Sequence, residues 1–352
     1  MHKTLIALAA LTAATPALPQ ASAAIASGKA QPSPLAPSEI VAAAPKADWT
    51  AIAASDLLVM DLAPDAKGKS RRVVIQLMPE PFSQGWVGNI RKLAATRFWD
   101  GTAVNRVQDN YVVQWGDPNA DDKAKAKKLP AGLETVPEDC YVNDYGGACD
   151  FDRRREGVAP KTKPKRTSLD IGPPPVPITP PPSWKITRDS YGAIPSFLYG
   201  WPIALGESER GTPQSWPVHC YGMVGVGRDL SPNTGSGAEL YVVIGHAPRH
   251  LDRNIALVGR VIEGIEHLSS LPRGHGALGF YDLAQGDERT GIVSIRLGSE
   301  VADLPTYEYL STESASFAKY ADARANRRDA FFIRPAGGAD ICNIPVPVRR
   351  VT

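Results

Sequence analysis

The sequence predicts a mainly β fold, a barrel or a sandwich, and three observations support this class. Short apolar runs of strand length follow one another closely along the 352-residue chain. The 32 prolines and 31 glycines favour loops and short strands over long helices. Two segments of the expected core place their apolar residues at helical spacing. A doubly wound sheet, in which strands alternate with helices, is therefore not predicted.

The expected strands form two groups on either side of a long central region. The first group is 56–62, 71–78, 102–107 and 110–116, and the second is 221–228, 238–246, the start of 256–271, and 291–301. These runs are apolar and are bounded by turn-forming residues, which is the pattern of short strands.

Two helices are expected in the core and one near the carboxy terminus. Trp86 and Ile90 belong to an apolar series at helical spacing, which predicts an amphipathic helix with Pro81 in its first turn. The segment 256–271 passes from a strand into the second helix, and 314–328 is the third.

The first 23 residues have the pattern of a secretory signal. "MHK" carries the positive charge, an apolar run follows, and small residues before and at Ala23 suit cleavage there. Pro16 interrupts the run, which is shorter than the roughly 20 residues that span a bilayer. A buried helix or a membrane anchor is the alternative. We therefore expect a periplasmic or secreted protein with no membrane span after signal removal.

The sequence divides into six expected segments. They are a signal peptide at 1–23, a flexible leader at 24–47, the first part of the barrel at 48–118, an inserted region at 119–219, the second part of the barrel at 220–302, and a helix and tail packed on the barrel at 303–352. The inserted region holds basic clusters and the proline tract "GPPPVPITPPPSW". It is expected to be a solvated surface loop, and the alternative is an arm that binds a protein partner.

Charge and cysteine content limit the partners and the compartment. A net charge of +2 gives no global field that favours nucleic acid as a partner. Four cysteines in an exported chain indicate disulfides, with three possible pairings. A local bridge between Cys140 and Cys149 is the first expectation, and it leaves Cys220 with Cys342. A zinc site is the alternative, but the sequence has no CxxC motif.

Two blocks of the sequence resemble the cyclophilin-type peptidylprolyl isomerases. The first, 71–118, contains "EPFSQGWVGNIRKL" and "FWDGTAVNRVQDNYVVQWGDP"; the second, 222–271, contains "SPNTGSGAELYVVIGHAPRHLDRNIALVGRVIEGIEHL". The resemblance implies an eight-stranded antiparallel barrel capped by two helices, with the central region inserted between strands. It also implies cis-trans isomerisation of X–Pro bonds in proline-containing polypeptides, without a metal or an organic cofactor.

The resemblance assigns one catalytic residue and a set of substrate-binding residues. Arg106 aligns with the family's catalytic arginine, whose guanidinium can donate a hydrogen bond to the prolyl nitrogen. The substrate-binding positions that the resemblance implies are Tyr111, Val112, Gln114, Gly227, Glu239, Tyr241, His250 and Leu251.

Several positions depart from the family pattern. Asn105 and Ile255 stand where members have histidine, and Glu239 stands where they have a second glutamine. If the Glu239 carboxylate turned inward it would pair with Arg106 and compete with the substrate. The sequence therefore supports two functions: an isomerase of exported proteins, or a weak or inactive barrel that binds proline-containing segments. A hydrolase is disfavoured because the chain has no GxSxG motif.

Overall fold

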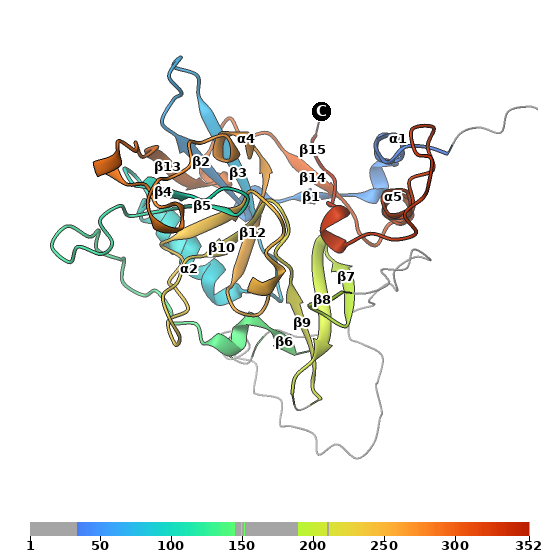
Figure 1. Ribbon diagram of the computed structural model, residues 1–352, viewed down its shortest axis with the longest axis horizontal. Coiled ribbons are helices and arrows are strands. Elements are labelled where there is room, and N and C mark those ends of the chain that lie inside the picture. Colours follow the sequence, from blue (N-terminus) through green and yellow to red (C-terminus); the bar gives the residue numbers. More distant parts are fainter. Residues whose placement is uncertain (1–33, 145–148, 150, 152–188, 210, 352) are drawn as a thin grey trace, which may run out of the picture.

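The computed structural model describes residues 34–144, 149, 151, 189–209 and 211–351. Figure 1 shows a strand-rich barrel with smaller sheets beside it. The expected signal peptide and the proline tract lie outside the described residues.

Eight antiparallel strands form the central sheet, in the order β13-β2-β3-β12-β10-β11-β5-β4. Their bounds are β2 Leu57–Leu62, β3 Arg71–Leu77, β4 Ala103–Val107, β5 Val112–Gly116, β10 Met223–Val226, β11 Leu240–Val243, β12 Leu257–Glu263 and β13 Ile292–Leu297. The edge strands β4 and β13 approach each other, because Ile292 N donates to Thr102 O at 2.8 Å and Val104 N donates to Thr290 O at 2.9 Å. The sheet is a nearly closed barrel, so the predicted fold class is confirmed.

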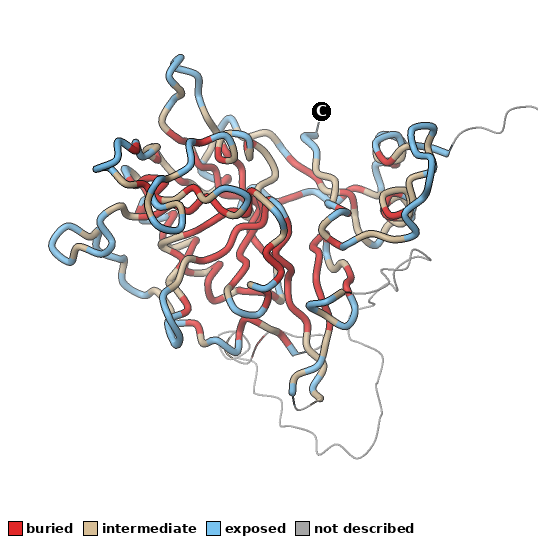
Figure 2. Tube along the Cα trace, in the orientation of Figure 1, coloured by how far each residue is buried: buried red, intermediate tan, exposed pale blue. Residues whose placement is uncertain are grey.

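Side chains on alternate faces of β5 and β11 enter two different apolar clusters. Val113, Trp115 and Val242 are fully buried in the main core inside the barrel. Val112 and Tyr241, one residue out of phase, belong to a second small cluster. Because side chains alternate along a strand, this second cluster lies on the outer face of the barrel. The burial map in Figure 2 shows the strands of the barrel as the most continuously buried part of the chain.

A β-bulge interrupts strand β4 between Val104 and Arg106. Val104 is paired with Trp115, and Arg106 is paired with Gln114, so two steps on β4 match one step on β5. Val104 and Trp115 are both in the core of the barrel. The bulge therefore turns Arg106 to the opposite, outer face, which a regular strand would not do.

The helix that caps the barrel starts later than the sequence predicted. Helix α2 spans Gln84–Ala95, and Pro81 precedes it instead of lying in its first turn. Trp86 and Ile90 are completely buried in the core, and the Trp86 indole N–H donates to Thr234 O at 3.2 Å. The second expected helix is one short turn, α4 Glu266–Ser269.

The inserted region is not only a solvated loop, which corrects that expectation. It contributes a four-stranded sheet in the order β6-β9-β8-β7. The bounds are β6 Asn143–Asp144, β7 Ile194–Leu198, β8 Trp201–Glu207 and β9 Pro213–Pro217. Trp201, Ile203 and Trp216 from this sheet are buried in the main core. These apolar side chains attach the sheet to the barrel.

A third sheet joins the two ends of the described chain. Strands β1 Trp49–Ile52, β14 Tyr307–Leu310 and β15 Val348–Arg350 are hydrogen-bonded in the order β1-β14-β15. Helices α1 Pro37–Ala42 and α5 Ala315–Ala325 pack together beside it. Trp49, Phe317 and Tyr320 form part of its separate core. Part of the expected flexible leader is thus ordered, and the carboxy-terminal helix packs in this unit instead of lying directly on the barrel.

Both expected disulfides are confirmed. Cys140 is bonded to Cys149 with a Cα–Cα distance of 5.2 Å, and Cys220 is bonded to Cys342 with a Cα–Cα distance of 5.0 Å. The second bridge ties the carboxy-terminal segment to the start of the second barrel block. In the described part of the chain no helix has the length and apolarity needed to cross a membrane.

The two disulfides differ in the length of chain that they close, which predicts unequal effects on stability. The Cys220–Cys342 bridge spans 122 residues and the Cys140–Cys149 bridge spans 9. Loss of loop-closure entropy in the unfolded chain corresponds to about 5 kcal/mol for the long loop and about 2.5 kcal/mol for the short loop. Urea denaturation of the paired serine variants should show the larger loss for Cys220→Ser/Cys342→Ser. Equal losses, or no loss for that variant, would contradict this estimate.

Candidate active site

Four residues on adjacent strands form a row across the outer face of the barrel. The strand register pairs Arg106 with Gln114, Gln114 with Tyr241, and Tyr241 with Gly225. Directly opposed residues in an antiparallel pair share one face of the sheet. The Arg106 guanidinium donates to Gln114 Oε1 at 3.1 Å, so the first two side chains are in contact.

The Arg106 guanidinium is held in place from several sides. Its Nε donates to Leu278 O at 2.7 Å, and one terminal nitrogen donates to the Gln108 side chain. The aromatic rings of Phe280 and Tyr111 lie 5.3 Å and 5.6 Å from the guanidinium carbon. Burial lowers the pKa of Arg106, while Tyr111 and Glu239 act in the opposite direction. Arginine stays protonated in proteins, so the site holds a fixed and partly desolvated positive charge.

A loop that precedes β13 supplies the contacts on one side of Arg106. Gly274 N donates to Val107 O at 3.0 Å and Tyr281 N donates to Asn105 O at 2.9 Å, so the loop runs along β4. Leu278, in the same loop, has a left-handed backbone with φ of 55° and is 66% exposed. The loop thus fixes Arg106 through a backbone carbonyl and presents an apolar side chain beside the site.

Glu239 lies close to the row but does not form an ion pair with Arg106 in the described structure. A Cβ atom added at Gly227 would lie 3.0 Å from Glu239 Cγ, so glycine leaves room for this carboxyl. Burial raises the pKa of Glu239, while hydrogen bonding from Gln114 and the charge of Arg106 lower it. Gln114 therefore interacts with both groups. The direct pairing that the sequence raised as a possibility is replaced by contact through the glutamine.

The apolar floor beside Arg106 is made by side chains from two strands. Val112 and Tyr241 are buried in the small outer cluster, and Tyr111 and Ile255 pack against it half-buried. The Tyr111 ring is stacked on His250 with a centroid distance of 6.4 Å. Together these side chains provide an apolar surface next to the guanidinium.

Tyr241 is anchored from behind by a buried polar chain that sequence reasoning missed. Its hydroxyl lies 2.8 Å from His219 Nε2, and His219 Nδ1 lies 2.9 Å from Asp252 Oδ1. Arg249 Nε donates to Asp252 Oδ2 at 2.6 Å, and Arg249 Nη2 donates to Asp189 Oδ2 at 2.7 Å. The backbone N–H of His219 also donates to Asp252 Oδ1 at 2.9 Å.

The burial and the hydrogen bonds of His219 define the protonation state of its ring. Burial lowers the pKa of His219 and outweighs the opposite effect of Asp252, so we assign a neutral ring whose Nδ1–H donates to Asp252 Oδ1 and whose Nε2 accepts. The Tyr241 hydroxyl therefore donates to His219 and points away from the substrate side. Only the ring and the apolar neighbours of Tyr241 can contribute to the site.

The remaining expected residues lie at the margin of the cluster. His250 is exposed and Leu251 is half-buried, and both belong to a 3-10 helix, Arg249–Leu251. The structure thus brings Arg106, Gln114 and Glu239 into one cluster with Gly227. Leu251 follows His250 in the sequence, and no side-chain contact in the described structure defines a role for it. In the described residues no group of three or more His, Cys, Asp and Glu side chains could hold a metal ion.

Sequence reasoning did not identify Gln108 or the loop around Leu278 as parts of the site. Gln108 lies two residues after Arg106, and this spacing was the only available signal. Nothing in the sequence indicates that a backbone carbonyl 172 residues away accepts from Arg106.

The chain is similar to known proteins in sequence and in structure. A sequence profile of the family described as "Cyclophilin type peptidyl-prolyl cis-trans isomerase/CLD" matches residues 66–278. The fold is similar to that of the cyclophilin AquaCyp293 from Hirschia baltica, with a TM-score of 0.58 and 22% identity over 86% of this chain and 94% of that chain. No curated protein matches the sequence.

More distant similarity extends to a solved structure from another organism. A cyclophilin type peptidyl-prolyl cis-trans isomerase from Cryptosporidium parvum, crystallised in the presence of the dipeptide Ala-Pro, has a TM-score of 0.34 and 11% identity, over 68% of this chain and 98% of that chain. This similarity is too low to support an argument about the site.

The raised pKa of Glu239 predicts a pH-dependent effect on stability. A carboxyl whose pKa is higher in the folded state favours folding fully below its unfolded-state value, and this contribution is lost as the pH rises through the folded-state pKa. Glu239→Gln keeps the neutral form at every pH. Its unfolding free energy should therefore exceed that of the natural protein by more at about pH 8 than at about pH 4.

Urea denaturation at the two pH values measures this difference. Glu300→Gln, a change of the same kind at an exposed position, is the matched control. A stability difference for Glu239→Gln that is independent of pH, or that grows toward acid, would show that ionisation of the half-buried Glu239 carboxyl does not destabilise the fold.

Proposed function

Because the chain belongs to the family of cyclophilin-type peptidyl-prolyl cis-trans isomerases, we propose that it catalyses rotation about X–Pro peptide bonds with Arg106 as its catalytic residue. The observation that carries this proposal is the position of the Arg106 guanidinium on the outer face of the barrel. It is fixed there by Leu278 O and Gln114, next to the apolar floor that contains Tyr111 and Val112.

The reaction needs electrostatic help more than acid or base chemistry. Partial double-bond character of the peptide bond gives a rotation barrier of about 18–20 kcal/mol. A hydrogen bond to the prolyl nitrogen localises its lone pair and weakens this double-bond character. A donor that is already fixed in position needs no reorganisation when the amide twists, and therefore stabilises the transition state more than the ground state.

The hydrogen bonds of Arg106 leave donors for this contact. A guanidinium has five N–H groups. Nε donates to Leu278 O, one terminal nitrogen donates to Gln114, and the other donates to Gln108. Each terminal nitrogen keeps one N–H that these acceptors do not use. These two groups are the ones we assign to the twisted amide.

The other residues of the row position the substrate. The prolyl ring would pack on Tyr111 and Val112, with the Tyr241 ring beneath them. The Gln114 amide, which already accepts from Arg106, would hold the substrate backbone through its remaining polar groups. The substrates that fit this arrangement are proline-containing polypeptides, and the chemistry uses no metal or organic cofactor.

A second function, a weak or inactive module that binds proline-containing segments, is supported by Glu239. Its carboxyl is half-buried next to Gln114 and within electrostatic reach of Arg106. An ionised Glu239 weakens the pull of Arg106 on the prolyl nitrogen, because opposite charges in a partly desolvated site attract strongly.

We also propose that the protein works outside the cytoplasm on exported clients. The signal-like amino terminus and two disulfides support this location, because structural disulfides persist in oxidising compartments. The proline-rich part of the inserted region is proposed as a further contact surface for a protein partner.

Removal of the guanidinium is the direct test of the proposed function. Arg106→Ala should lower kcat/KM for an X–Pro peptide by about 100- to 1,000-fold, the range seen when one preorganised donor is lost. A protease-coupled or NMR exchange assay on the purified chain measures this rate. Arg91→Ala, at a half-buried arginine of helix α2 that pairs with Asp56, is the matched control and should keep the natural rate. An unchanged rate in Arg106→Ala would refute the assignment.

Replacement of the nearby carboxyl distinguishes the two functions. If ionised Glu239 restrains an active site, Glu239→Gln should raise the isomerase rate several-fold at neutral pH, and the gain should shrink as the pH falls and Glu239 itself becomes protonated. The same assay from about pH 5 to about pH 8 measures the gain. If the natural protein and Glu239→Gln both bind a proline peptide without turnover, the binding module is the better description.

A further inference from the structure

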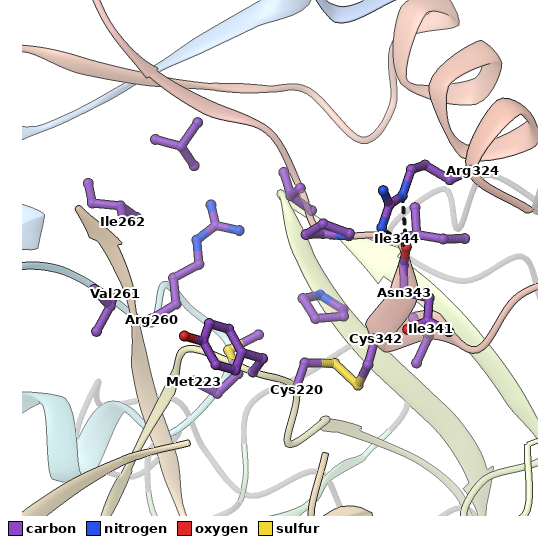
Figure 3. Close-up of a pocket in the computed structure, with 15 residues that line it drawn as sticks. Cys220, Met223, Arg260, Val261, Ile262, Arg324, Ile341, Cys342, Asn343 and Ile344 are labelled. Carbon is purple, nitrogen blue, oxygen red and sulfur yellow. Dashed lines mark hydrogen bonds between the residues drawn. A yellow bond between two sulfur atoms is a disulfide. The ribbon is translucent and has the colours of Figure 1, made fainter. Parts of the chain in front are cut away.

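A cavity that is lined by none of the residues of the Arg106 site lies between the barrel, the inserted sheet and the carboxy-terminal segment. Its volume is about 390 Å³. Met223 of β10 and Arg260 of β12 line it from the barrel, and Ile341 and Ile344 line it from the carboxy-terminal segment (Figure 3). The Cys220–Cys342 disulfide is part of the wall. Both sides of the cavity are therefore linked covalently.

All charged side chains in the cavity wall are positive. Arg260 and Arg324 are among its fifteen lining residues, and none of the fifteen is an aspartate or a glutamate. Arg324 donates twice to the backbone oxygen of Asn343 and forms no ion pair in the described structure. Most of the other lining side chains are apolar. The cavity thus combines an apolar wall with two positive charges.

Arg260 is buried without a carboxylate partner among the described residues. It is 7% exposed and donates to Gln76 Oε1 and Gly200 O, which are both neutral acceptors. The Trp201 and Tyr309 rings lie 4.5 Å and 5.8 Å from its guanidinium carbon. Burial lowers the pKa of Arg260 to about 10, and the Tyr309 phenol acts in the opposite direction.

The other buried arginine of the described chain shows the usual arrangement. Arg249 is 4% exposed and is bound by the carboxylates of Asp252 and Asp189. An unpaired buried charge is costly, and a counter-ion offsets part of that cost. Arg260 has the burial of Arg249 but lacks its acids, and it borders a cavity instead. Figure 3 shows its side chain reaching into the space between Ile262 and Ile344.

We propose that this cavity is a binding site for a small amphiphilic carboxylate, with its anionic head at Arg260 and its apolar body against Met223, Ile341 and Ile344. A carboxylate matches the planar fork of a guanidinium and can accept two parallel hydrogen bonds. Ligand pockets of a few hundred Å³ with apolar walls and a few polar groups are the usual form of small-molecule sites. The site is independent of the proposed isomerase function.

Octanoate is the probe for this site, with 1-octanol as its uncharged counterpart. Isothermal titration of the full chain at low salt should give a Kd for octanoate below about 1 mM and at least about tenfold weaker binding of 1-octanol. Arg260→Gln should weaken octanoate binding by about tenfold or more, a loss of 1.4 kcal/mol or more. Arg71→Gln is the matched control, because Arg71 does not line the cavity and, among the described residues, donates to the carbonyls of Ala63 and Pro64; it should bind like the natural protein.

A second variant keeps the test decisive if Arg260→Gln does not fold, which circular dichroism would reveal. Arg324 is only half-buried and adds a second positive charge to the cavity wall, so Arg324→Gln should fold and should weaken octanoate binding several-fold. Absence of octanoate binding to the natural protein, equal binding of octanoate and 1-octanol, or unchanged binding in the folded arginine variants would each overturn the proposal.

Discussion

The bulge between Val104 and Arg106 is the constraint on which the candidate site depends. A strand of strict alternation that buries Val104 would also direct Arg106 into the barrel, where a guanidinium would displace apolar core. The extra residue turns Arg106 outward, opposite Gln114 on β5. One local irregularity in the backbone thus converts a core position into a position that faces substrate. Its neighbour Asn105 is left with a buried side-chain oxygen that has no hydrogen-bond partner in the described structure.

Two separate supports keep this geometry rigid. On one side, the loop before β13 bonds along β4 and supplies the carbonyl of Leu278 to Arg106. On the other side, the chain from Asp252 through His219 fixes the hydroxyl of Tyr241 and so the floor of the site. Neither the Leu278 carbonyl nor the His219–Asp252 pair is assigned a contact with the reacting bond. Both reduce the reorganisation needed when an amide twists beside the guanidinium.

The sequence predicts the parts of this site whose signal is local, and fails where the signal is distant. The strands could be identified because their apolar pattern is local, and Arg106 could be identified because the residues around it resemble a cyclophilin motif. The disulfide pairing followed from the proximity of Cys140 and Cys149. The sheet of the inserted region was missed because proline and basic clusters conceal short strands, and its attachment depends on tryptophans such as Trp201 that reach the core only in three dimensions. The bulge could not be predicted, because β4 is too short for its apolar and polar residues to reveal a break in alternation.

The central claim is that the free N–H groups of Arg106 face the nitrogen of a bound proline. A crystal structure of the protein with a short peptide that contains one X–Pro bond tests this claim most directly. The account predicts the prolyl ring on Tyr111 and Val112, with the prolyl nitrogen within about 3.5 Å of an Arg106 terminal nitrogen. A peptide bound with its proline away from this face, or with Arg106 turned from the prolyl nitrogen, would contradict the account.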